Sequence, residues 1–334
     1  MDSRSLEEVK RYTIYPMKHT TLNTFLYSFF TLLIVHLCGA LFVACSPGSA
    51  SQSSAIECGY ITSSGDARLY YEMAGHGTPI ILVHGHSLDS RMWDDQFAAF
   101  AAHHRVVRYD CRGYGRSSQQ SEDFHFLHAA DLVTIMDSLH IDRAHIVGLS
   151  MGGFITADML VYAPHRMLSA VLANGHFRSS PGPSEPIDPA YEARRDSTIA
   201  VVCQEGIESY KRRWFETLMN TGGAEVERIR KPLWKMISEW SGWQATHKEV
   251  RLLLGRDGIR MLEQMKPIIP TLVLTGIEKP RPNVKAPSFM RHLPNSRWEK
   301  MEETGHMMNM ERPTLFNMTV LDFISEIDDS SDKL

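Results

Sequence analysis

The protein has 334 residues, and its 35 Lys and Arg against 39 Asp and Glu give a formal net charge of −4. A chain so close to neutral offers no broad positive surface to a phosphate backbone, so nucleic acid is not expected as a partner. Hydrophobic residues make up 43% and charged residues 22%, a globular composition that excludes a disordered or fibrous chain. The five cysteines are scattered and form no C-x-x-C pair, so neither a disulfide framework nor a zinc or redox site is predicted.

A strongly apolar run from Phe25 to Ala44 dominates the amino-terminal part of the chain. Basic residues precede this run, and no Lys or Arg follows it before Arg68, which predicts a cytoplasmic start and export of everything after it. A cleaved signal peptide, an uncleaved anchor helix and a buried core helix are all conceivable. The core helix is disfavoured because the run lacks charged residues for a solvent face. Met17 would make a better signal-peptide start than Met1, because acidic residues follow Met1.

The sequence Phe42-Val43-Ala44-Cys45 at the end of this run resembles the lipobox of bacterial lipoproteins. In that family the cysteine is lipidated and becomes the new amino terminus, which here implies lipidation of Cys45 and a membrane-anchored protein of the cell envelope. Cleavage near Gly48 would instead give a secreted or periplasmic protein. We therefore expect residues 1–45 to be a targeting segment and residues 46–58, rich in small residues, to be a flexible tether.

From Gly59 onward, β-branched runs alternate with helical patterns. The eight predicted strands are Gly59–Ser63, Arg68–Ala74, Ile80–Val83, Arg105–Tyr109, Ala144–Val147, Met167–Ala173, Thr271–Thr275 and Arg297–Met301. The helical patterns that fall among them are Trp93–Ala102, Leu127–Leu139, Met151–Tyr162 and Thr314–Ile327. Strands that alternate with helices predict an α/β fold with a mostly parallel eight-stranded sheet and helices on both faces.

The alternation breaks in residues 177–254. This stretch opens with four prolines, turns helical, and carries four of the six tryptophans of the chain. Because it contains no apolar run typical of a buried strand, we expect a helical lid inserted between two strands of the sheet. The core of the predicted fold is then formed by residues 59–176 and 255–334.

The sequence Gly148-Leu149-Ser150-Met151-Gly152 follows a predicted buried strand and opens a helix. A serine in this G-x-S-x-G context lies on a tight strand-to-helix turn, for which the flanking glycines Gly148 and Gly152 leave room. The turn projects the Ser150 Oγ outward and places backbone N–H groups, including that of Met151, near a developing oxyanion. Ser150 is thus predicted to be a nucleophile.

Together with three further segments, this motif resembles the α/β-hydrolase family over the chain from about Gly59. The segments are His84-Gly85-His86-Ser87 after the third strand, Asp110-Cys111-Arg112-Gly113-Tyr114-Gly115-Arg116-Ser117 after the fourth, and Thr304-Gly305-His306 through Glu311-Arg312-Pro313. The resemblance implies the α/β-hydrolase fold with an inserted lid. It also implies that the backbone N–H of His86 is the second oxyanion donor beside that of Met151.

The same resemblance implies that His306 is the base that activates Ser150, because it carries the histidine of the family's G-H-x-x-x-x-E-x-P segment. The family places an acid just after the strand Thr271–Thr275. There the sequence departs from the usual pattern, with Lys279 where Asp is common and Glu278 directly before it. Glu278 is therefore the expected third member of a Ser-His-acid triad, with a lid acid or no acid as alternatives.

These residues predict a serine hydrolase that cleaves an ester or related acyl bond of a small, largely apolar molecule through an acyl-enzyme. Carbon–carbon bond hydrolases, enol-lactonases and cofactor-free haloperoxidases keep the serine and stay open, whereas epoxide hydrolases and haloalkane dehalogenases use an aspartate nucleophile. A non-catalytic ligand-binding protein on the same fold is a further alternative. No metal, nucleotide or flavin cofactor is expected.

Overall fold

The computed structural model describes residues 55–119, 121–122, 124–186, 188–248, 253–279 and 284–331. The predicted targeting segment with Cys45, and nearly all of the predicted tether, lie outside these residues. Within the described ranges, no helix combines the length and the apolar character needed to cross a membrane.

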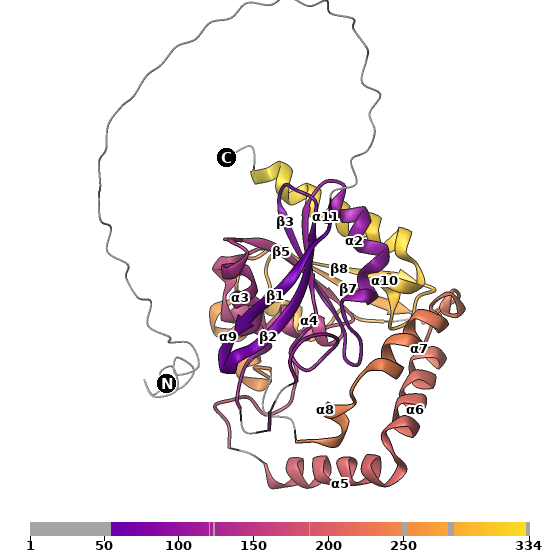
Figure 1. The fold of residues 1–334 in the computed structure, drawn as a ribbon. Coiled ribbons are helices and arrows are strands. Elements are labelled where there is room, and N and C mark those ends of the chain that lie inside the picture. Colours follow the sequence, from indigo (N-terminus) through magenta and orange to yellow (C-terminus); the bar gives the residue numbers. More distant parts are fainter. Residues whose placement is uncertain are drawn as a thin grey trace, which may run out of the picture.

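One eight-stranded sheet forms the centre of the molecule, with the order β1-β2-β4-β3-β5-β6-β7-β8 (Figure 1). The strands are β1 (Glu57–Ser63), β2 (Ala67–Ala74), β3 (Pro79–Val83), β4 (Arg105–Tyr109), β5 (Ala144–Leu149), β6 (Met167–Ala173), β7 (Thr271–Ile277) and β8 (Ser296–Glu302). β2 runs antiparallel to both β1 and β4, and every other neighbouring pair is parallel. The mostly parallel eight-stranded sheet predicted from the sequence is confirmed.

The first strand begins earlier than expected. Glu57 and Cys58, which we assigned to the tether, pair with Met73 and Glu72 of β2. Both residues are exposed. Because neither needs an apolar side chain at a buried position, the sequence pattern did not indicate that they belong to a strand. The tether can therefore extend no further than the residues before β1.

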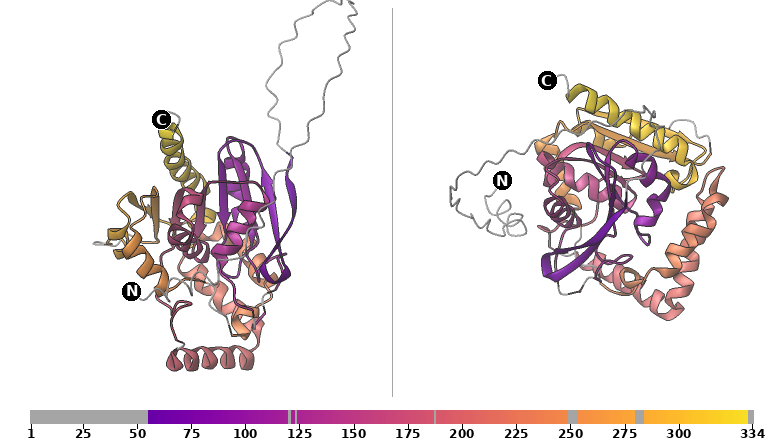
Figure 2. Two further views of the ribbon diagram at one scale, coloured as in Figure 1. Left: turned by 90° about the vertical axis from the view of Figure 1, so that its left-hand side faces the viewer. Right: turned by 45° about the horizontal axis from the view of Figure 1, so that its top comes forward.

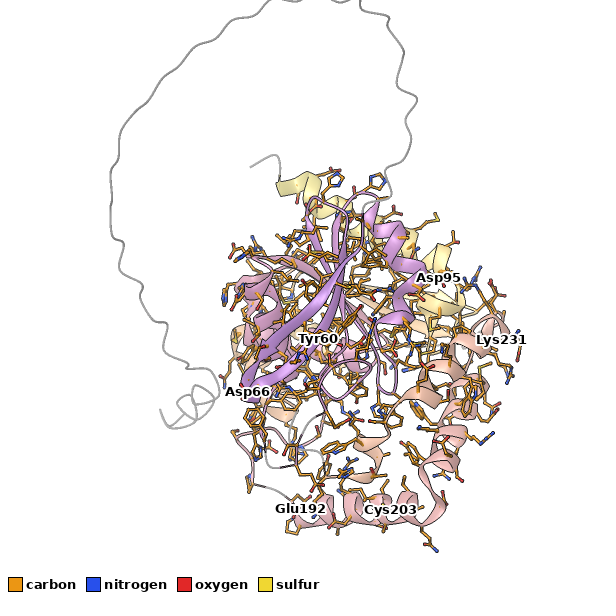
Figure 3. The ribbon with its side chains drawn as sticks, viewed as in Figure 1. Tyr60, Asp66, Asp95, Glu192, Cys203 and Lys231 are labelled. Atoms are coloured by element: carbon orange, nitrogen blue, oxygen red, sulfur yellow. The ribbon has the colours of Figure 1, made fainter. Side chains whose placement is uncertain are left out.

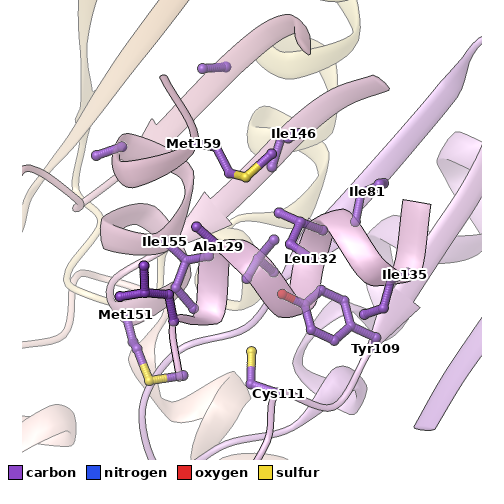
Figure 4. Packing of buried hydrophobic residues seen from close by; sticks show 14 of the residues in the cluster. Ile81, Tyr109, Cys111, Ala129, Leu132, Ile135, Ile146, Met151, Ile155 and Met159 are labelled. Atoms are coloured by element: carbon purple, nitrogen blue, oxygen red, sulfur yellow. The ribbon is translucent and has the colours of Figure 1, made fainter. Parts of the chain in front are cut away.

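Helices cover both faces of the sheet, as predicted. α2 (Asp94–Ala101) and α11 (Pro313–Ser331) pack in one apolar cluster, and α3 (His128–Ser138) and α4 (Met151–Tyr162) pack in the other (Figure 2). α9 (Arg256–Met265) contributes Leu262 beside α4. Figure 4 shows Met151, Ile155 and Met159 of α4 in the same cluster as Ala129, Leu132 and Ile135 of α3. α4 buries all but two of its twelve residues, which holds the start of this helix rigidly against β5.

The segment between β6 and β7 forms an arm of helices beyond one end of the sheet (Figure 1). It contains α5 (Pro189–Glu205), α6 (Ile207–Asn220), α7 (Arg230–Glu239) and the short α8 (Trp243–Thr246), and α9 follows before β7. Val202 is the only buried residue of α5. Figure 3 places Glu192 and Cys203, at opposite ends of α5, along the outer edge of the molecule. The lid is therefore a thin layer, in contrast to the packed core.

Candidate active site

Ser150 lies at the sharp turn between β5 and α4. Its backbone has φ of 57° and ψ of −114°, a region that residues other than glycine seldom adopt. Two hydrogen bonds hold this conformation, one from the Ser150 N–H to the Ala173 carbonyl (2.9 Å) and one from the Phe154 N–H to the Ser150 carbonyl (3.0 Å). The strained turn lifts the serine side chain out of the sheet, as the G-x-S-x-G sequence predicted.

The two glycines of the motif are required by close backbone contacts. A Cβ atom on Gly148 would overlap the Gly152 carbonyl, and a Cβ atom on Gly152 would overlap the Val83 carbonyl. Any side chain at either position would therefore push α4 away from the sheet. The elbow depends on both residues for packing, since neither has a positive φ angle.

His306 lies in the loop between β8 and α10 (Met308–Glu311) and is partly buried. Burial lowers the pKa of the His306 imidazole, so the ring is neutral and able to accept a proton at neutral pH. The loop is held by the buried carboxylate of Glu311, which accepts hydrogen bonds from the N–H of Gly305 (2.8 Å) and of Met307 (3.2 Å). The backbone on either side of the histidine is therefore tied to one side chain.

One cavity of about 360 Å³ brings the predicted residues together. Ser150, His306, His86 and Met151 all line it. Gly85, next to His86, lies close to Ser150, because a Cβ built on Gly85 would be 3.6 Å from the serine Cβ. The nucleophile candidate, the base candidate and both oxyanion-donor candidates thus face one space, at the carboxyl ends of the strands.

The side chain of His86 is enclosed by aromatic rings. Its Nδ1 lies 2.8 Å from the Tyr114 hydroxyl, and ring contacts join it to Trp214 and Trp240 of the lid. Burial, reinforced by the positive charges of Arg195 and Arg178, lowers the pKa of His86 to about 4. This imidazole is therefore neutral at physiological pH and carries no charge into the cavity.

Glu278 follows directly after β7, and it borders a second hollow of about 280 Å³ together with His306. Asn174 lines the same hollow, and its amide donates to the carbonyl oxygens of Gly305 (3.2 Å) and His306 (3.0 Å) and accepts from the Gly276 N–H (3.1 Å). The structure thus places the predicted acid beside the loop of the predicted base, with an amide bracing that loop. Asn174 directly follows β6.

Part of the cavity lining was not anticipated. Arg178, Arg195 and His128 line the cavity beside Ser150, although a largely apolar ligand was expected. None of the three stands in a recognisable motif, and Arg195 lies in the lid, where the sequence pattern carries no distance information. Apolar and aromatic side chains complete the wall: Phe154, Val202, Tyr210, Trp214, Ala245 and Leu253.

Several hydrogen bonds attach the lid to the core around the cavity. The Trp214 indole donates to the Ser87 hydroxyl (2.7 Å), and the Gln244 amide donates to the Gly113 carbonyl (2.9 Å). At the far edge, the N–H of Gly223 donates to the Glu311 carboxylate (2.7 Å). The lid therefore touches the loop that carries the second oxyanion-donor candidate and the loop that carries His306.

Two charged residues of the loop after β4, Asp110 and Arg112, have structural partners. Asp110 is fully buried and accepts from the N–H groups of Ser90 (2.9 Å) and Arg116 (2.8 Å), and Arg112 forms an ion pair with the buried Asp131 (2.6 Å). Asp110 and Arg112 therefore brace the loop after β4. No group of three or more His, Cys, Asp or Glu placed to hold a metal ion occurs among the residues described.

Comparison with known proteins places this geometry in a family. Residues 80–318 match the model of the "Alpha/beta hydrolase family". RutD from Azorhizobium caulinodans, for which carbamate hydrolysis is the proposed activity, is 28% identical over 279 residues, which are 79% of this chain and 97% of RutD. The 3-oxoadipate enol-lactonase 1 of Acinetobacter baylyi is 25% identical over 80% of this chain and 97% of its own length. A hydrolase structure from Pseudomonas aeruginosa superposes with a TM-score of 0.62 at 26% identity, over 80% of this chain and 98% of that one.

Proposed function

The chain belongs to the alpha/beta hydrolase family and is a hydrolase, and from this premise we propose that it cleaves an ester or related acyl bond of a small molecule with Ser150 as nucleophile. The observation that carries the proposal is the strained elbow, which presents Ser150 to a cavity that His306 also lines. A non-glycine residue in such a conformation costs stability, and the fold retains it where the side chain must be exposed for reaction.

The proposed reaction has two halves. His306 accepts the proton of the Ser150 hydroxyl while the Oγ attacks the acyl carbon, and the resulting oxyanion accepts hydrogen bonds from the backbone N–H groups of His86 and Met151. The intermediate collapses as His306 returns the proton to the leaving alkoxide, which departs as the alcohol. Water, activated by the same histidine, then hydrolyses the acyl-enzyme and frees the acid.

Glu278 is the proposed orienting acid. A carboxylate that accepts a hydrogen bond from the imidazole selects one tautomer and stabilises the imidazolium formed during the reaction. Its place at the end of β7, bordering the same hollow as His306, supports the assignment. Asn174 contributes by holding the backbone of that loop.

Lactone opening is a second candidate, because a lactone is an internal ester and a relative over 80% of the chain is an enol-lactonase. The same residues would act, but the leaving alkoxide would stay attached to the acyl group and be released only when water frees the ring-opened acid. A simple lactone series beside the esters separates the two, since an enol-lactonase would prefer the cyclic substrate.

The test is a series of 4-nitrophenyl esters of increasing acyl length with protein lacking residues before Ser46. We expect wild-type turnover with a preference for short acyl chains, because the cavity is small. Ser150→Ala should abolish it, while Ser209→Ala, an exposed serine on α6, should not change it. Equal rates in Ser150→Ala and wild type would contradict the proposal.

We further propose that the protein is exported and lipidated at Cys45, on the strength of the lipobox-like sequence alone. Two acyl chains of a diacylglycerol suffice for stable membrane anchoring. The full chain should then incorporate labelled fatty acid and partition into detergent, and Cys45→Ser should do neither. Labelling that persists in Cys45→Ser would contradict lipidation, and membrane retention without any label would favour the uncleaved anchor helix.

A further inference from the structure

His128 is a buried histidine on the wall of the cavity that contains Ser150. It is the first residue of α3, it is only 2% exposed, and it lines the cavity. Ala129, the next residue, packs in the same apolar cluster as Met151, which follows the nucleophile (Figure 4). The imidazole therefore belongs to the part of the wall beside the start of α4.

The Nε2 atom of His128 has no hydrogen-bond partner among the residues that the structure describes. The ring of Phe126 meets the imidazole edge to face, with centroids 5.1 Å apart and an interplanar angle of 83°, and offers it no polar atom. An unpaired polar atom costs free energy when it is buried, whereas an apolar ring in the same place would not. The unpaired nitrogen therefore indicates a polar group that binds to the imidazole from the cavity.

The imidazole of His128 is uncharged at neutral pH. Burial, reinforced by the positive charge of Arg112 and by His84, lowers its pKa to about 3. A neutral imidazole can donate one hydrogen bond and accept another, but it supplies no charge that would attract an ion. The partner that suits this ring is an uncharged polar group such as a carbonyl or hydroxyl group.

The ring can present its polar atom to a ligand without moving its neighbours. A half turn of the imidazole about its Cβ–Cγ bond exchanges the positions of Nε2 and Cε1, and both orientations fill the same space. The rest of the wall includes the apolar side chains of Phe154, Val202 and Leu253, and the cavity volume is about 360 Å³. These dimensions and contacts suit an acyl chain of a few carbon atoms that carries one polar group.

We infer, on the basis of the acyl hydrolysis proposed above, that the acyl group of the substrate carries a second, uncharged oxygen group and that the imidazole of His128 donates a hydrogen bond to this oxygen. His128 is then a specificity-determining residue. The apolar side chains of the wall contact the carbon chain between the scissile bond and the second oxygen group. The site thus selects oxo- or hydroxy-substituted acyl groups over plain fatty acyl groups, because only the former pair with the buried ring.

The experiment compares two uncharged esters of equal chain length, 4-nitrophenyl hexanoate and 4-nitrophenyl 5-oxohexanoate. We expect a higher kcat/KM for the oxo ester in wild type. His128→Phe keeps a ring of similar shape but has no N–H, so the ratio of oxo to plain kcat/KM should fall about 3- to 30-fold, the effect of one hydrogen bond between uncharged groups. The intrinsic reactivity of each ester is the same toward both proteins and cancels from this comparison.

Two further variants serve as controls. His128→Gln keeps an N–H donor on a side chain of similar reach, so it should recover part of the ratio. His125→Phe makes the same substitution at an exposed position, outside the cavity, and should leave the ratio within about twofold of wild type. Urea unfolding should show that His128→Phe is folded, because Nε2 loses no hydrogen bond to the described residues.

Binding measurements separate this inference from the proposed function. In Ser150→Ala, 5-oxohexanamide should bind more tightly than hexanamide, and His128→Phe in the same background should remove this preference. Equal ester ratios in wild type and folded His128→Phe would overturn the His128 site, as would equal losses for both esters, since those would reflect a structural role. If wild type hydrolysed neither ester while the preference for 5-oxohexanamide still required His128, the site would stand and the proposed acyl hydrolysis would fail.

Discussion

The elbow at Ser150 and the lid helix α5 border the same cavity but are built in opposite ways. At the elbow, the backbone is strained, two glycines permit contacts that no side chain would fit, and the following helix α4 is almost entirely buried. α5 buries only Val202 and reaches the cavity through polar side chains such as Arg195. We infer that the core determines the reaction through its backbone geometry. The lid instead helps to determine which ligand binds, through side chains that can be substituted without disturbing the packed core.

The sharpest test of this division is the loss of the residues that react. Ser150→Ala and His306→Ala should each lower kcat by a factor of about 10³–10⁶, because the nucleophile and its base act as one unit. For the same reason the double variant should be no slower than about the slower single variant, as measured by ester turnover. Losses that multiply would show that the two residues act independently.

Glu278→Gln should have the next largest effect. Removing the charge while keeping the shape should lower kcat by about 10²–10⁴ with little change in KM, because the carboxylate acts on the imidazolium formed in the transition state. Glu278→Asp should retain more activity. Glu303→Gln, an exposed carboxylate in the loop before His306, is the matched control and should be silent. A silent Glu278→Gln beside an inactive His306→Ala would contradict this assignment and leave a lid acid as the alternative.

Glu311 is a positioning residue, and its effect should be smaller. Its carboxylate accepts hydrogen bonds from the backbone N–H groups of Gly305 and Met307, on either side of His306, and from that of Gly223 in the lid. Glu311→Gln replaces one acceptor oxygen by a donor, so we expect kcat to fall about 10- to 100-fold and the protein to lose roughly 1–3 kcal/mol of stability. Glu311→Asp should recover part of kcat. A loss of stability without any change in kcat would limit Glu311 to a purely structural role.

The pH dependence of turnover tests whether burial in the core lowers the pKa of the His306 base. Burial lowers the pKa of His306 below its ordinary value of 6.5, and the reaction requires the neutral ring. The kcat/KM for a neutral ester should therefore rise with pH through a midpoint below 6.5 and be nearly constant from pH 7 to 8. A midpoint above 7 would contradict the lowering of the His306 pKa by burial.

Asp158 should change stability but not turnover. This buried residue of α4 accepts a hydrogen bond from the Leu254 N–H, and burial raises its pKa to about 8. Below the unfolded pKa of about 3.9 the carboxyl group is protonated in both the folded and the unfolded chain, so its titration does not lower stability. Between about 3.9 and 8 only the unfolded chain ionises this group, so the free energy of unfolding falls by about 1.4 kcal/mol per pH unit. Asp158→Asn, which imitates the protonated group, should therefore gain stability relative to wild type between pH 5 and 8 in urea unfolding. A constant difference across this range would contradict the raised pKa.

The parts that could be predicted from the sequence are those that depend on backbone geometry. All eight strands and the four helices α2, α3, α4 and α11 were predicted from the sequence pattern, whereas α9 was not, and the elbow follows from the spacing of Gly148, Ser150 and Gly152. The predicted first strand starts two residues too late, because Glu57 and Cys58 are exposed and show no alternation of apolar and polar residues. Exposed residues give the sequence pattern too little information to set such boundaries.

The cavity wall could not be predicted in the same way. Arg178 lies in the segment after β6, Arg195 in the lid helix α5 and His128 at the start of α3, and only the folded chain brings them together. Nothing in their local sequence distinguishes them from the other charged residues nearby. Glu311 stood within a predicted motif, yet its three backbone partners could be identified only from the structure.

The central claim is that the strained elbow makes Ser150 a reactive nucleophile, and covalent labelling tests it most directly. Native protein treated with a fluorophosphonate should gain one adduct, which peptide mass mapping should assign to Ser150. The adduct should be absent from Ser150→Ala and strongly reduced in His306→Ala, while heat-unfolded protein should not react. Labelling at another serine, or no labelling of the folded protein, would contradict the account.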